Sequence, residues 1–572
     1  MARSLLLSTR DLEFLLYEWL DVSALTAQDR FAEHSRETFD AALDLSRTVA
    51  ERHFAPHNRR NDLEEPTFDG QTVHLHPEIG EALQVFHETG LMSAGMPERV
   101  GGMQLPAVVT TACFAWFQAA NISTSGYPFL TVANANLLLE YGTDEQVETY
   151  VRPMLEGRYY GTMCLSEPQA GSSLADVAVR AEPQEDGSYR LFGNKMWISG
   201  GDHELSQNII HLVLARVAGA PAGVKGLSLF IVPKWLPGQR NDVVLAGLNH
   251  KMGFRGTTNT LLNFGEGGFT PGGQPGAVGY LVGERNRGLA YMFHMMNEAR
   301  IGVGVGAVAL GYTGYLHALE YAKTREQGRR LVNRDPATAQ VPIIEHADVR
   351  RMLLAQKAYV EGGLALSLYC ARLVDTEDPV LDLLTPIAKS WPSQWCLAAN
   401  DLAIQVYGGY GYTRDYPVEQ FYRDNRLNPI HEGTHGIQGL DLLGRKVVQD
   451  GGALLQDLLG RIHATCDRAG DDTVRNAADR LAATTMRLWA TGDAELALAN
   501  ATVYLEAFGH VVVAWLWLEQ SLVAANQAGS FYDGKRAAAT YFLRYELPKV
   551  GPMLDLLDRL DRLTLDLNPA SL

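Results

Sequence analysis

Short apolar runs bounded by turn residues occupy the middle of this chain, whereas the segments on either side carry helical periodicity. Runs of this length between Gly- and Pro-rich turns are typical of β-strands. Asp186-Gly187 indicates a hairpin, because glycine tolerates the positive φ of a tight turn. The segment Gly265 to Gly279 is so rich in Gly and Pro that we predict a loop. The predicted strands are Tyr189 to Ser199, Ile209 to Arg216, Leu227 to Val232, Asn259 to Phe264 and Tyr280 to Val282.

The flanking segments are predicted to be helical. Glu37 to Phe54 and Pro77 to Leu91 repeat apolar residues at intervals of three and four, the stripe of a helix packed on one side. Polar residues that favour helix starts are Thr143, Asp471 or Asp472, and Asp493. The predicted class is α+β multidomain, divided into an N-terminal helical domain (1–155), a central β domain (156–285), a C-terminal helical bundle (286–450) and an additional helical domain (451–572).

Charge and cysteine usage narrow the function class. The 49 Lys and Arg against 66 Asp and Glu give a net charge of −17, which argues against a whole-chain nucleic-acid binder. Five cysteines without a C-x-x-C pair make neither a disulfide framework nor a zinc ribbon. Arg10 interrupts the apolar start at Leu5 to Leu7, and Val511 to Leu518 is shorter than the roughly 20 residues of a membrane span. We therefore expect a cytoplasmic protein with no membrane span.

Two motifs are tempting in isolation. His431-Glu432-Gly433-Thr434-His435 matches H-E-x-x-H, in which two histidines one helical turn apart bind zinc and the glutamate activates water. Its Gly433 and Thr434, with Pro429 upstream, have poor helix propensity. The glycines from Gly302 to Gly306 fail the G-x-G-x-x-G spacing and follow no strand, so close helix packing is the better interpretation.

A set of unusual segments occurs in one order along the chain. Two lie in the β region, a hydroxyl-rich loop and a Lys-Met-Trp-Ile-Ser strand, and the others lie in the helical bundle. They are Cys164 to Ser173, Lys195 to Gly201, Asn297 to Arg300, Arg325 to Arg329, Gln405 to Tyr412, and Tyr422 to Asp424 leading into Pro429 to Gln438.

These segments resemble those of the acyl-CoA dehydrogenase family, FAD enzymes with a helical, β-barrel and helical domain order. The resemblance covers about 150–446 with specific motifs and 30–150 more weakly. The segment 451–572 resembles the additional helical domain of the long members. The resemblance implies binding of FAD and of an acyl-CoA substrate.

In the family, the loop and strand of the β domain hold the isoalloxazine of FAD. The resemblance carries this role onto Leu165, Ser166, Gly171, Ser172, Trp197, Ile198 and Ser199. Ser199 replaces the commoner Thr and keeps the hydroxyl, whereas Ser173 stands where many relatives have Asp. Trp197 at this position would form a wall against the ring, although a core Trp would look the same in sequence.

The resemblance also implies that Arg325 pairs with the FAD diphosphate of a partner subunit. Gln405, Gly408 and Gly409 match a glycine-rich turn that approaches the same diphosphate, where a Cβ would block the backbone N–H donors. Thr434 is carried over as a further FAD contact. A monomer is therefore expected to bind FAD badly.

Glu432 matches the family's catalytic base in its I-x-E-G-T-x-x-I-Q context. Burial beside an apolar acyl chain would raise its pKa and improve it as a base. In some members the base comes from the position matching Ala299, and Glu298 is one residue out of register, about 100° away on a helix. The substrate contacts implied by the resemblance are Ser172, Asn297, Arg300, His431 and Gly433, with His431 replacing the usual Tyr.

The implied reaction is α,β-dehydrogenation of an acyl-CoA to a trans-2-enoyl-CoA. Glu432 removes the α-proton, the β-hydrogen leaves as hydride to flavin N5, and an electron-transfer flavoprotein takes the electrons. Because the extra helices of long members cover a dimer–dimer surface, we expect a homodimer. The alternatives are an acyl-CoA oxidase that uses oxygen, a zinc peptidase acting through His431 to His435, and a non-catalytic relative.

Overall fold

The computed structural model describes residues 4–332 and 335–572, apart from the side chains at positions 294, 296 and 297. The chain divides into two units. The barrel unit contains residues 33–105 and 116–299, and the helical unit contains the described residues up to 32 together with 106–115 and 300–572. Helices α5 (Ala107–Ala120) and α9 (Gly288–Thr324) contribute residues to both units.

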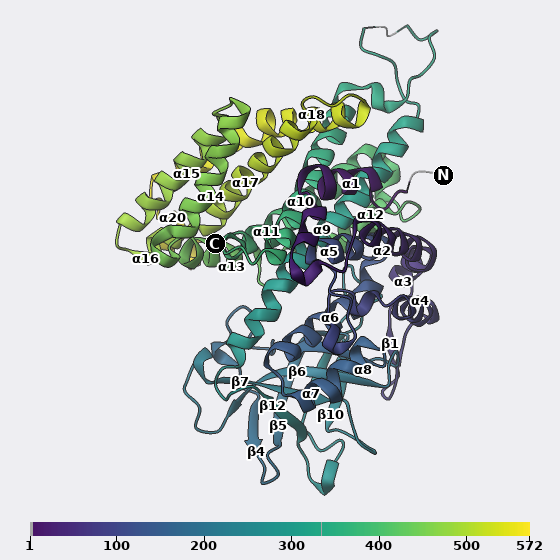
Figure 1. Cartoon of the computed structure of the whole chain (residues 1–572), viewed down its shortest axis with the longest axis vertical. Coiled ribbons are helices and arrows are strands. Elements are labelled where there is room, and N and C mark those ends of the chain that lie inside the picture. Colours follow the sequence, from purple (N-terminus) through teal and green to yellow (C-terminus); the bar gives the residue numbers. More distant parts are fainter. Residues whose placement is uncertain (1–3, 333–334) are drawn as a thin grey trace. The chain divides into compact units, whose positions relative to one another are not determined.

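The strands of the barrel unit, most of them labelled in Figure 1, include five that pair into a closed ring. β5 pairs with β12, β12 with β7 and β7 with β6, and β4 pairs with both β6 and β5 to close the ring. β11 and β10 extend the sheet from β5, and β3 lies parallel to β6. The strands are β3 (Tyr159–Cys164), β4 (Arg180–Pro183), β5 (Tyr189–Ser199), β6 (Asn208–Val217), β7 (Leu227–Pro233), β10 (Val243–Leu248), β11 (Asn259–Phe264) and β12 (Ala277–Val282).

Strand β6 shows why this ring is stable. Its side chains alternate between two apolar cores, since successive residues of a strand point to opposite faces. Ile210 and Leu212 join a cluster that includes Leu137 of α6 (Ile122–Tyr141). Val213 joins the other cluster, with residues of the opposite barrel strands. A strand buried on both faces reads as the continuous apolar run seen in the sequence.

The predicted α+β class, with a barrel-like β domain between helical segments, is confirmed. The helix start predicted at Thr143 is confirmed, and Thr143 forms a capping box with Gln146 at the start of α7 (Asp144–Gln146). The predicted loop Gly265 to Gly279 is wrong at its end, because β12 begins at Ala277. The other helices of the barrel unit that precede the strands are α2 (Arg36–Val49), α3 (Asn58–Leu63), α4 (Pro77–Glu88) and α8 (Arg152–Leu155).

The helical unit contains long helices, and α14, α15 and α17 lie side by side near its C-terminal end (Figure 1). Asp493 caps α16 by accepting the N–H of Leu496, as predicted. Asp472 occupies the N-cap of α15 but makes no capping bond with its side chain. The helices are α10 (Ala347–Asp375), α11 (Val380–Tyr407), α12 (Val418–Asn425), α13 (His435–Asp441), α14 (Ala453–Ala469), α15 (Thr473–Ala490), α16 (Ala494–Leu498), α17 (Ala501–Ala524), α18 (Ser530–Tyr541) and α19 (Val550–Asp558).

Two features bind the helices of this unit closely. A Cβ on Gly304 of α9 would lie 2.1 Å from the carbonyl oxygen of Ala388 in α11, so glycine permits the close helix contact predicted for this run. Buried charges tie α18 to α10 and to α1 (Thr9–Glu13): Lys535 pairs with Asp11 and lies 3.0 Å from Glu361 Oε2. The C-terminal helices are thus part of the same packed unit.

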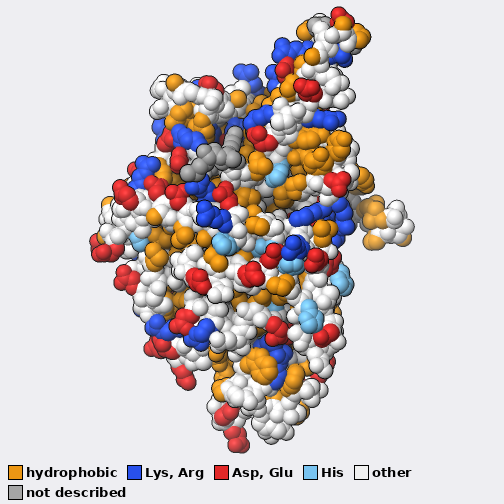
Figure 2. Space-filling view, turned by 90° about the vertical axis from the view of Figure 1, so that its right-hand side faces the viewer, with side chains coloured by type: hydrophobic (Ala, Val, Ile, Leu, Met, Phe, Trp, Pro, Cys, Tyr) orange, Lys and Arg blue, Asp and Glu red, His pale blue; other side chains and the backbone are white. Residues whose placement is uncertain are grey.

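Two helices, α9 and α17, are long and apolar enough to cross a membrane by length and composition. The apolar part of α17 extends beyond the short stretch from Val511 to Leu518 that the sequence analysis singled out. However, 83% of the apolar window of α17 and 89% of that of α9 are buried inside the protein, as in core helices. On the face shown in Figure 2, acidic and basic side chains are interspersed.

Candidate active site

Glu432 lies on a bend between α12 and α13 whose backbone is strained. Its φ of +54° lies in the left-handed region, which is uncommon for a residue with a side chain. The next residue, Gly433, has φ +88°, and a Cβ there would lie 2.5 Å from Nε2 of Gln438. Gln438 Nε2 donates to the carbonyl oxygen of Glu432 at 3.0 Å, and the Thr434 side chain caps α13 by accepting the N–H of Ile437. The E-G-T-x-x-I-Q pattern therefore encodes the turn.

Two cations act on the Glu432 carboxyl group. Burial raises the pKa of Glu432, and the charges of Lys389 and Arg300 oppose this rise. Arg300 is buried and forms an ion pair with Asp441, with Nη1 2.9 Å from Oδ2. Lys389 of α11 is buried, and its Nζ donates to the carbonyl oxygen of Gly433 at 2.7 Å. Sequence reasoning missed Lys389, since nothing in an apolar helical stretch marks one lysine as facing another segment.

The two histidines of the H-E-x-x-H motif have separate surroundings. His431 Nε2 lies 3.0 Å from Asn428 Oδ1, which it donates to, and burial lowers the pKa of His431 to about 3. His435 begins α13 and lies 3.4 Å from Glu506 of α17. The zinc interpretation needs both histidines on one turn of one helix, but residues 431–433 form a bend outside α13. The H-E-x-x-H match, the alternative interpretation of this segment, therefore lacks the helix that a zinc peptidase motif needs.

The hydroxyl-rich loop of the barrel unit follows β3 and is held in place by a buried lysine of β5. Lys195 of β5 is buried, and its Nζ donates to Leu165 O at 2.8 Å and to Glu167 Oε1 at 2.9 Å. Burial works to raise the pKa of Glu167, but Lys195 and the N–H groups of Ala178 and Val179 outweigh it, so the pKa lies below its usual range. The sequence places Glu167 and Lys195 in two of the family-like segments but does not predict this ion pair between them.

The end of β5 presents an aromatic ring outward. Trp197 has φ +66° and is 59% exposed, an unusual combination of backbone strain and apolar exposure. Ile198 is buried, and the Ser199 hydroxyl accepts a hydrogen bond from Asn259 Nδ2 at 3.2 Å. Met196 N donates to Ser166 O at 3.0 Å, so the loop and the strand are joined. Gly171 and Ser172 are exposed on that loop.

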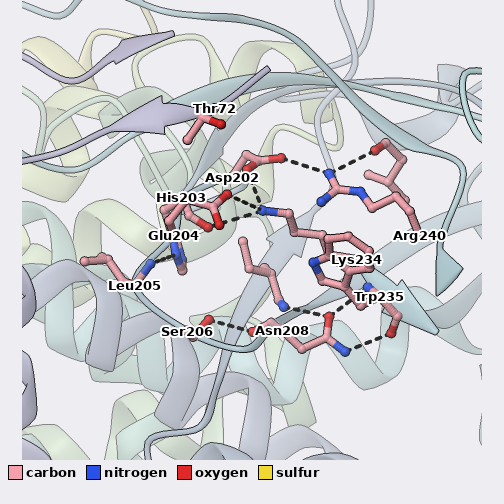
Figure 3. Close-up of polar contacts among 12 residues, drawn as sticks. Thr72, Asp202, His203, Glu204, Leu205, Ser206, Asn208, Lys234, Trp235 and Arg240 are labelled. Carbon is pink, nitrogen blue, oxygen red and sulfur yellow. Dashed lines mark hydrogen bonds and ion pairs between the residues drawn. The ribbon is translucent and has the colours of Figure 1, made fainter. Parts of the chain in front are cut away.

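Polar contacts fix the segment that follows β5 (Figure 3). The Nζ of Lys234 is 2.8 Å from Asp202 Oδ1 and also donates to the carbonyl oxygen of His203. Asp202 Oδ2 accepts from Arg240 at 3.4 Å. Asn208 exchanges hydrogen bonds with the backbone of Trp235, both of 2.9 Å. The chain beyond Ser199 is thereby held against the end of β7.

Arg325 and the glycine-rich turn line one cavity of about 510 Å³ in the helical unit. The guanidinium carbon of Arg325 lies 5.4 Å from the centre of the Tyr410 ring. Gly408 has φ +62° and ψ −138°, a conformation that favours glycine. Gln405 is exposed on the last turn of α11 and is not one of the lining residues. Those are Tyr321, Arg325, Gln327, Ile343, Val406, Tyr407, Gly408, Gly409, Tyr410 and Thr413.

The donor chemistry of these places fits FAD. A guanidinium beside backbone N–H groups with no Cβ suits a diphosphate, and an exposed Trp ring beside a hydroxyl suits a flat heteroaromatic group. Asn297 belongs to α9, but its side chain lies outside the described residues. Glu298 accepts two hydrogen bonds from Asn136 Nδ2, of 2.8 and 2.9 Å, so its carboxylate is already engaged.

Four family models match successive parts of the chain. They are the acyl-CoA dehydrogenase N-terminal domain (residues 36–158), middle domain (162–266) and C-terminal domain (286–447), followed by the acetyl-CoA dehydrogenase C-terminal like domain (458–568). Among solved structures, an acyl-CoA dehydrogenase from Bacillus anthracis complexed with FAD aligns with a TM-score of 0.73 at 19% identity. It covers 95% of this chain and 91% of that one, and it shows the shared fold.

Curated relatives match over nearly the whole length. A broad-specificity linear acyl-CoA dehydrogenase of Mycobacterium tuberculosis is 35% identical over 99% of both chains. The 3-methylmercaptopropionyl-CoA dehydrogenase of Ruegeria pomeroyi is 36% identical over 94% of this chain and 95% of its own. Because relatives this similar are matched from end to end, the chain belongs to the acyl-CoA dehydrogenase family, FAD-dependent oxidoreductases that act on CH–CH groups.

Proposed function

We propose that this enzyme converts a saturated acyl-CoA to its trans-2-enoyl-CoA with Glu432 as the base. The observation that carries this assignment is a carboxyl group on a strained, well-braced turn, with a pKa raised by burial. A group with a pKa nearer neutrality is a better acceptor for a weakly acidic α-proton. FAD, when bound, supplies the acceptor for the two electrons.

The turn offers a donor for the substrate as well as the base. Within the described residues, no acceptor lies on the backbone N–H of Glu432. This N–H would donate to the thioester oxygen and stabilise the charge that develops when the α-proton leaves. Arg300, through Asp441, would keep α9 and α13 in register beside the acyl chain, and Gly433 and the neutral His431 would contact it. Asn297 and Ser172 remain proposed substrate contacts.

The resemblance to the family supports a set of proposed FAD contacts. The proposed flavin contacts are Leu165, Ser166, Gly171, Ser172, Trp197, Ile198, Ser199 and Thr434. Arg325, Gln405, Gly408 and Gly409 would bind the diphosphate of the partner subunit's FAD. Support comes from the cavity that brings Arg325 and the glycine-rich turn together. The assembly proposed here is a homodimer, for which light scattering would give about twice the chain mass of 62.8 kDa.

The proposed electron acceptor is an electron-transfer flavoprotein, and the proposed location is the cytoplasm. An acyl-CoA oxidase is the competing activity with the same base. The two are separated by oxygen consumption during turnover without another acceptor: rapid consumption would identify the oxidase. The division into segments 1–155, 156–285, 286–450 and 451–572 also stays a proposal.

The deciding experiment is an anaerobic titration of the FAD-loaded protein with a panel of acyl-CoAs. Because relatives are named for linear acyl-CoA, butyryl-CoA and 3-methylmercaptopropionyl-CoA, the panel should include linear chains of several lengths and that thioether. Bleaching of the flavin band with formation of the enoyl-CoA is expected. A protein that stays yellow with every member would contradict the proposal.

A further inference from the structure

Lys389 is a buried cation that the catalytic assignment leaves unexplained. It lies on α11 between Ala388 and Ser390, with no exposed surface. Among the described residues, its Nζ makes one hydrogen bond, which it donates to Gly433 O at 2.7 Å. No carboxylate of the described residues lies within ion-pair distance of this ammonium group. An ammonium group buried without a carboxylate partner is costly, so its presence needs a compensating role.

The acceptor of this bond lies in the strained turn itself. Glu432 and Gly433 both have positive φ values, and two side chains from helices hold their carbonyl groups. Gln438 of α13 binds the carbonyl oxygen of Glu432, and Lys389 of α11 binds that of Gly433. With both bonds in place, two successive peptide planes are fixed, the one after Glu432 by Gln438 and the one after Gly433 by Lys389. The backbone that carries the Glu432 side chain is thereby held.

The other charges around the turn are already compensated. Arg300 of α9 pairs with Asp441 of α13, which also pairs with Arg445. His435 lies beside Glu506 of α17, and His431 is kept neutral by burial. Lys389 and Arg300 both act on the Glu432 carboxyl group, but only Arg300 of the two has a carboxylate partner among the described residues.

We propose that Lys389 is a positioning residue for the base: it holds the Glu432–Gly433 turn through the Gly433 carbonyl and supplies the positive charge that keeps the Glu432 carboxylate ionised. This inference rests on the proposed role of Glu432. Burial lowers the pKa of Lys389 to about 7. The negative charge of Glu432 opposes this lowering, and the positive charge of Arg300 adds to it. The positive charge is thus lost as the pH rises through this range.

The test compares Lys389→Met, which removes the charge at similar length, with Lys389→Arg, which keeps it. Lys446→Met is the matched control, because Lys446 is also buried but pairs with Asp382. The readouts are the pH profile of kcat/KM and, independently of activity, hydrogen–deuterium exchange of amides 431–438 with and without FAD.

For Lys389→Met we expect the acid limb of kcat/KM to move up by about one pH unit or more, a loss of about tenfold below the limb, and faster exchange at 431–438. Lys389→Arg should keep the acid limb and lose the decline above neutral pH, since arginine stays protonated. Lys446→Met should match the wild type in both readouts.

An unchanged acid limb and unchanged exchange in Lys389→Met would overturn the inference, as would the same shift in Lys446→Met. If Lys389→Met does not fold, the test rests on Lys389→Arg. A decline of kcat/KM above neutral pH that persists in Lys389→Arg would then overturn the inference. Glu432→Gln distinguishes a failure of the proposed base from a failure of the proposed role of Lys389. Full activity in that variant removes the base itself, whereas an inactive Glu432→Gln beside an unchanged Lys389→Met removes only the role of Lys389.

Discussion

Gln438 reaches back from the first turn of α13 and donates from Nε2 to the carbonyl oxygen of Glu432 at 3.0 Å. The same side chain occupies the space that a Cβ on Gly433 would need. Glu432 and the glutamine six residues later therefore form one structural unit, and the glycine between them is required by both the backbone angle and the space. This relationship explains why the turn keeps a glutamate in the left-handed region.

Replacing Glu432 with glutamine tests the base with little change of shape. Because the amide cannot accept the α-proton, we expect the rate of flavin bleaching by acyl-CoA to fall by about 10²–10⁴-fold. FAD content should stay at the wild-type level. Stopped-flow absorbance under anaerobic conditions measures the rate. Glu320→Gln, at a half-buried residue paired with Lys323, is the control and should bleach normally. Wild-type bleaching in Glu432→Gln would remove it as the base.

Lys195→Met tests the anchor of the hydroxyl-rich loop, which is proposed to contact the flavin. The substitution leaves Glu167 as a buried carboxylate without its cation, and breaking a buried pair of this kind costs about 3–5 kcal/mol. We expect a lower Tm of the barrel unit and weaker FAD retention on dilution, followed by flavin fluorescence. Lys225→Met, at an exposed position, should change neither. An unaltered Tm in Lys195→Met would show that the pair contributes little.

Gly408→Ala tests the glycine-rich turn that is proposed to bind the FAD diphosphate. No atom lies within 4 Å of the added Cβ, so the effect comes from backbone strain at φ +62° and ψ −138°, about 1–3 kcal/mol. Relief of that strain would displace the N–H donors, and we expect at least a several-fold increase in the Kd for FAD. Gly460→Ala is the matched control, since Gly460 is exposed within α14 and alanine favours a helix. Equal FAD affinity in both variants would contradict the role of the turn.

The sequence predicted β5, β6, β7 and β11 and part of β12, but it missed β4 and the six-residue strands β3 and β10. Tyr189–Ser199 and Asn259–Phe264 were predicted with the bounds that β5 and β11 have. β4 was missed because Arg-Ala-Glu-Pro has neither alternation nor an apolar run, although it closes the barrel by pairing with two strands. Such a strand is selected by its neighbours rather than by its own composition.

In the site, too, the features set by residues close together in sequence could be predicted, and a contact between distant segments could not. The turn around Glu432 could be predicted because its determinants, Gly433, Thr434 and Gln438, are close together in sequence. Lys389 could not, because its contact with Gly433 joins residues 44 positions apart and depends on how α11 packs against the loop. A single buried lysine in a helical pattern carries no signal of the segment that it faces.

The pH dependence of stability provides a last test of Lys389. Its pKa is about 7 in the folded protein against 10.5 for an ordinary lysine. Between these values the unfolded chain binds a proton that the folded chain does not, so the wild type gains stability as the pH rises from about 7 to 10. The destabilisation is fully present below pH 7. Lys389→Met has no group that titrates at this position, so its stability does not change with pH for this reason. The Tm of the variant minus that of the wild type should therefore be highest near pH 7 and fall toward pH 10. A Tm difference that is the same at every pH in this range would show that Lys389 titrates normally.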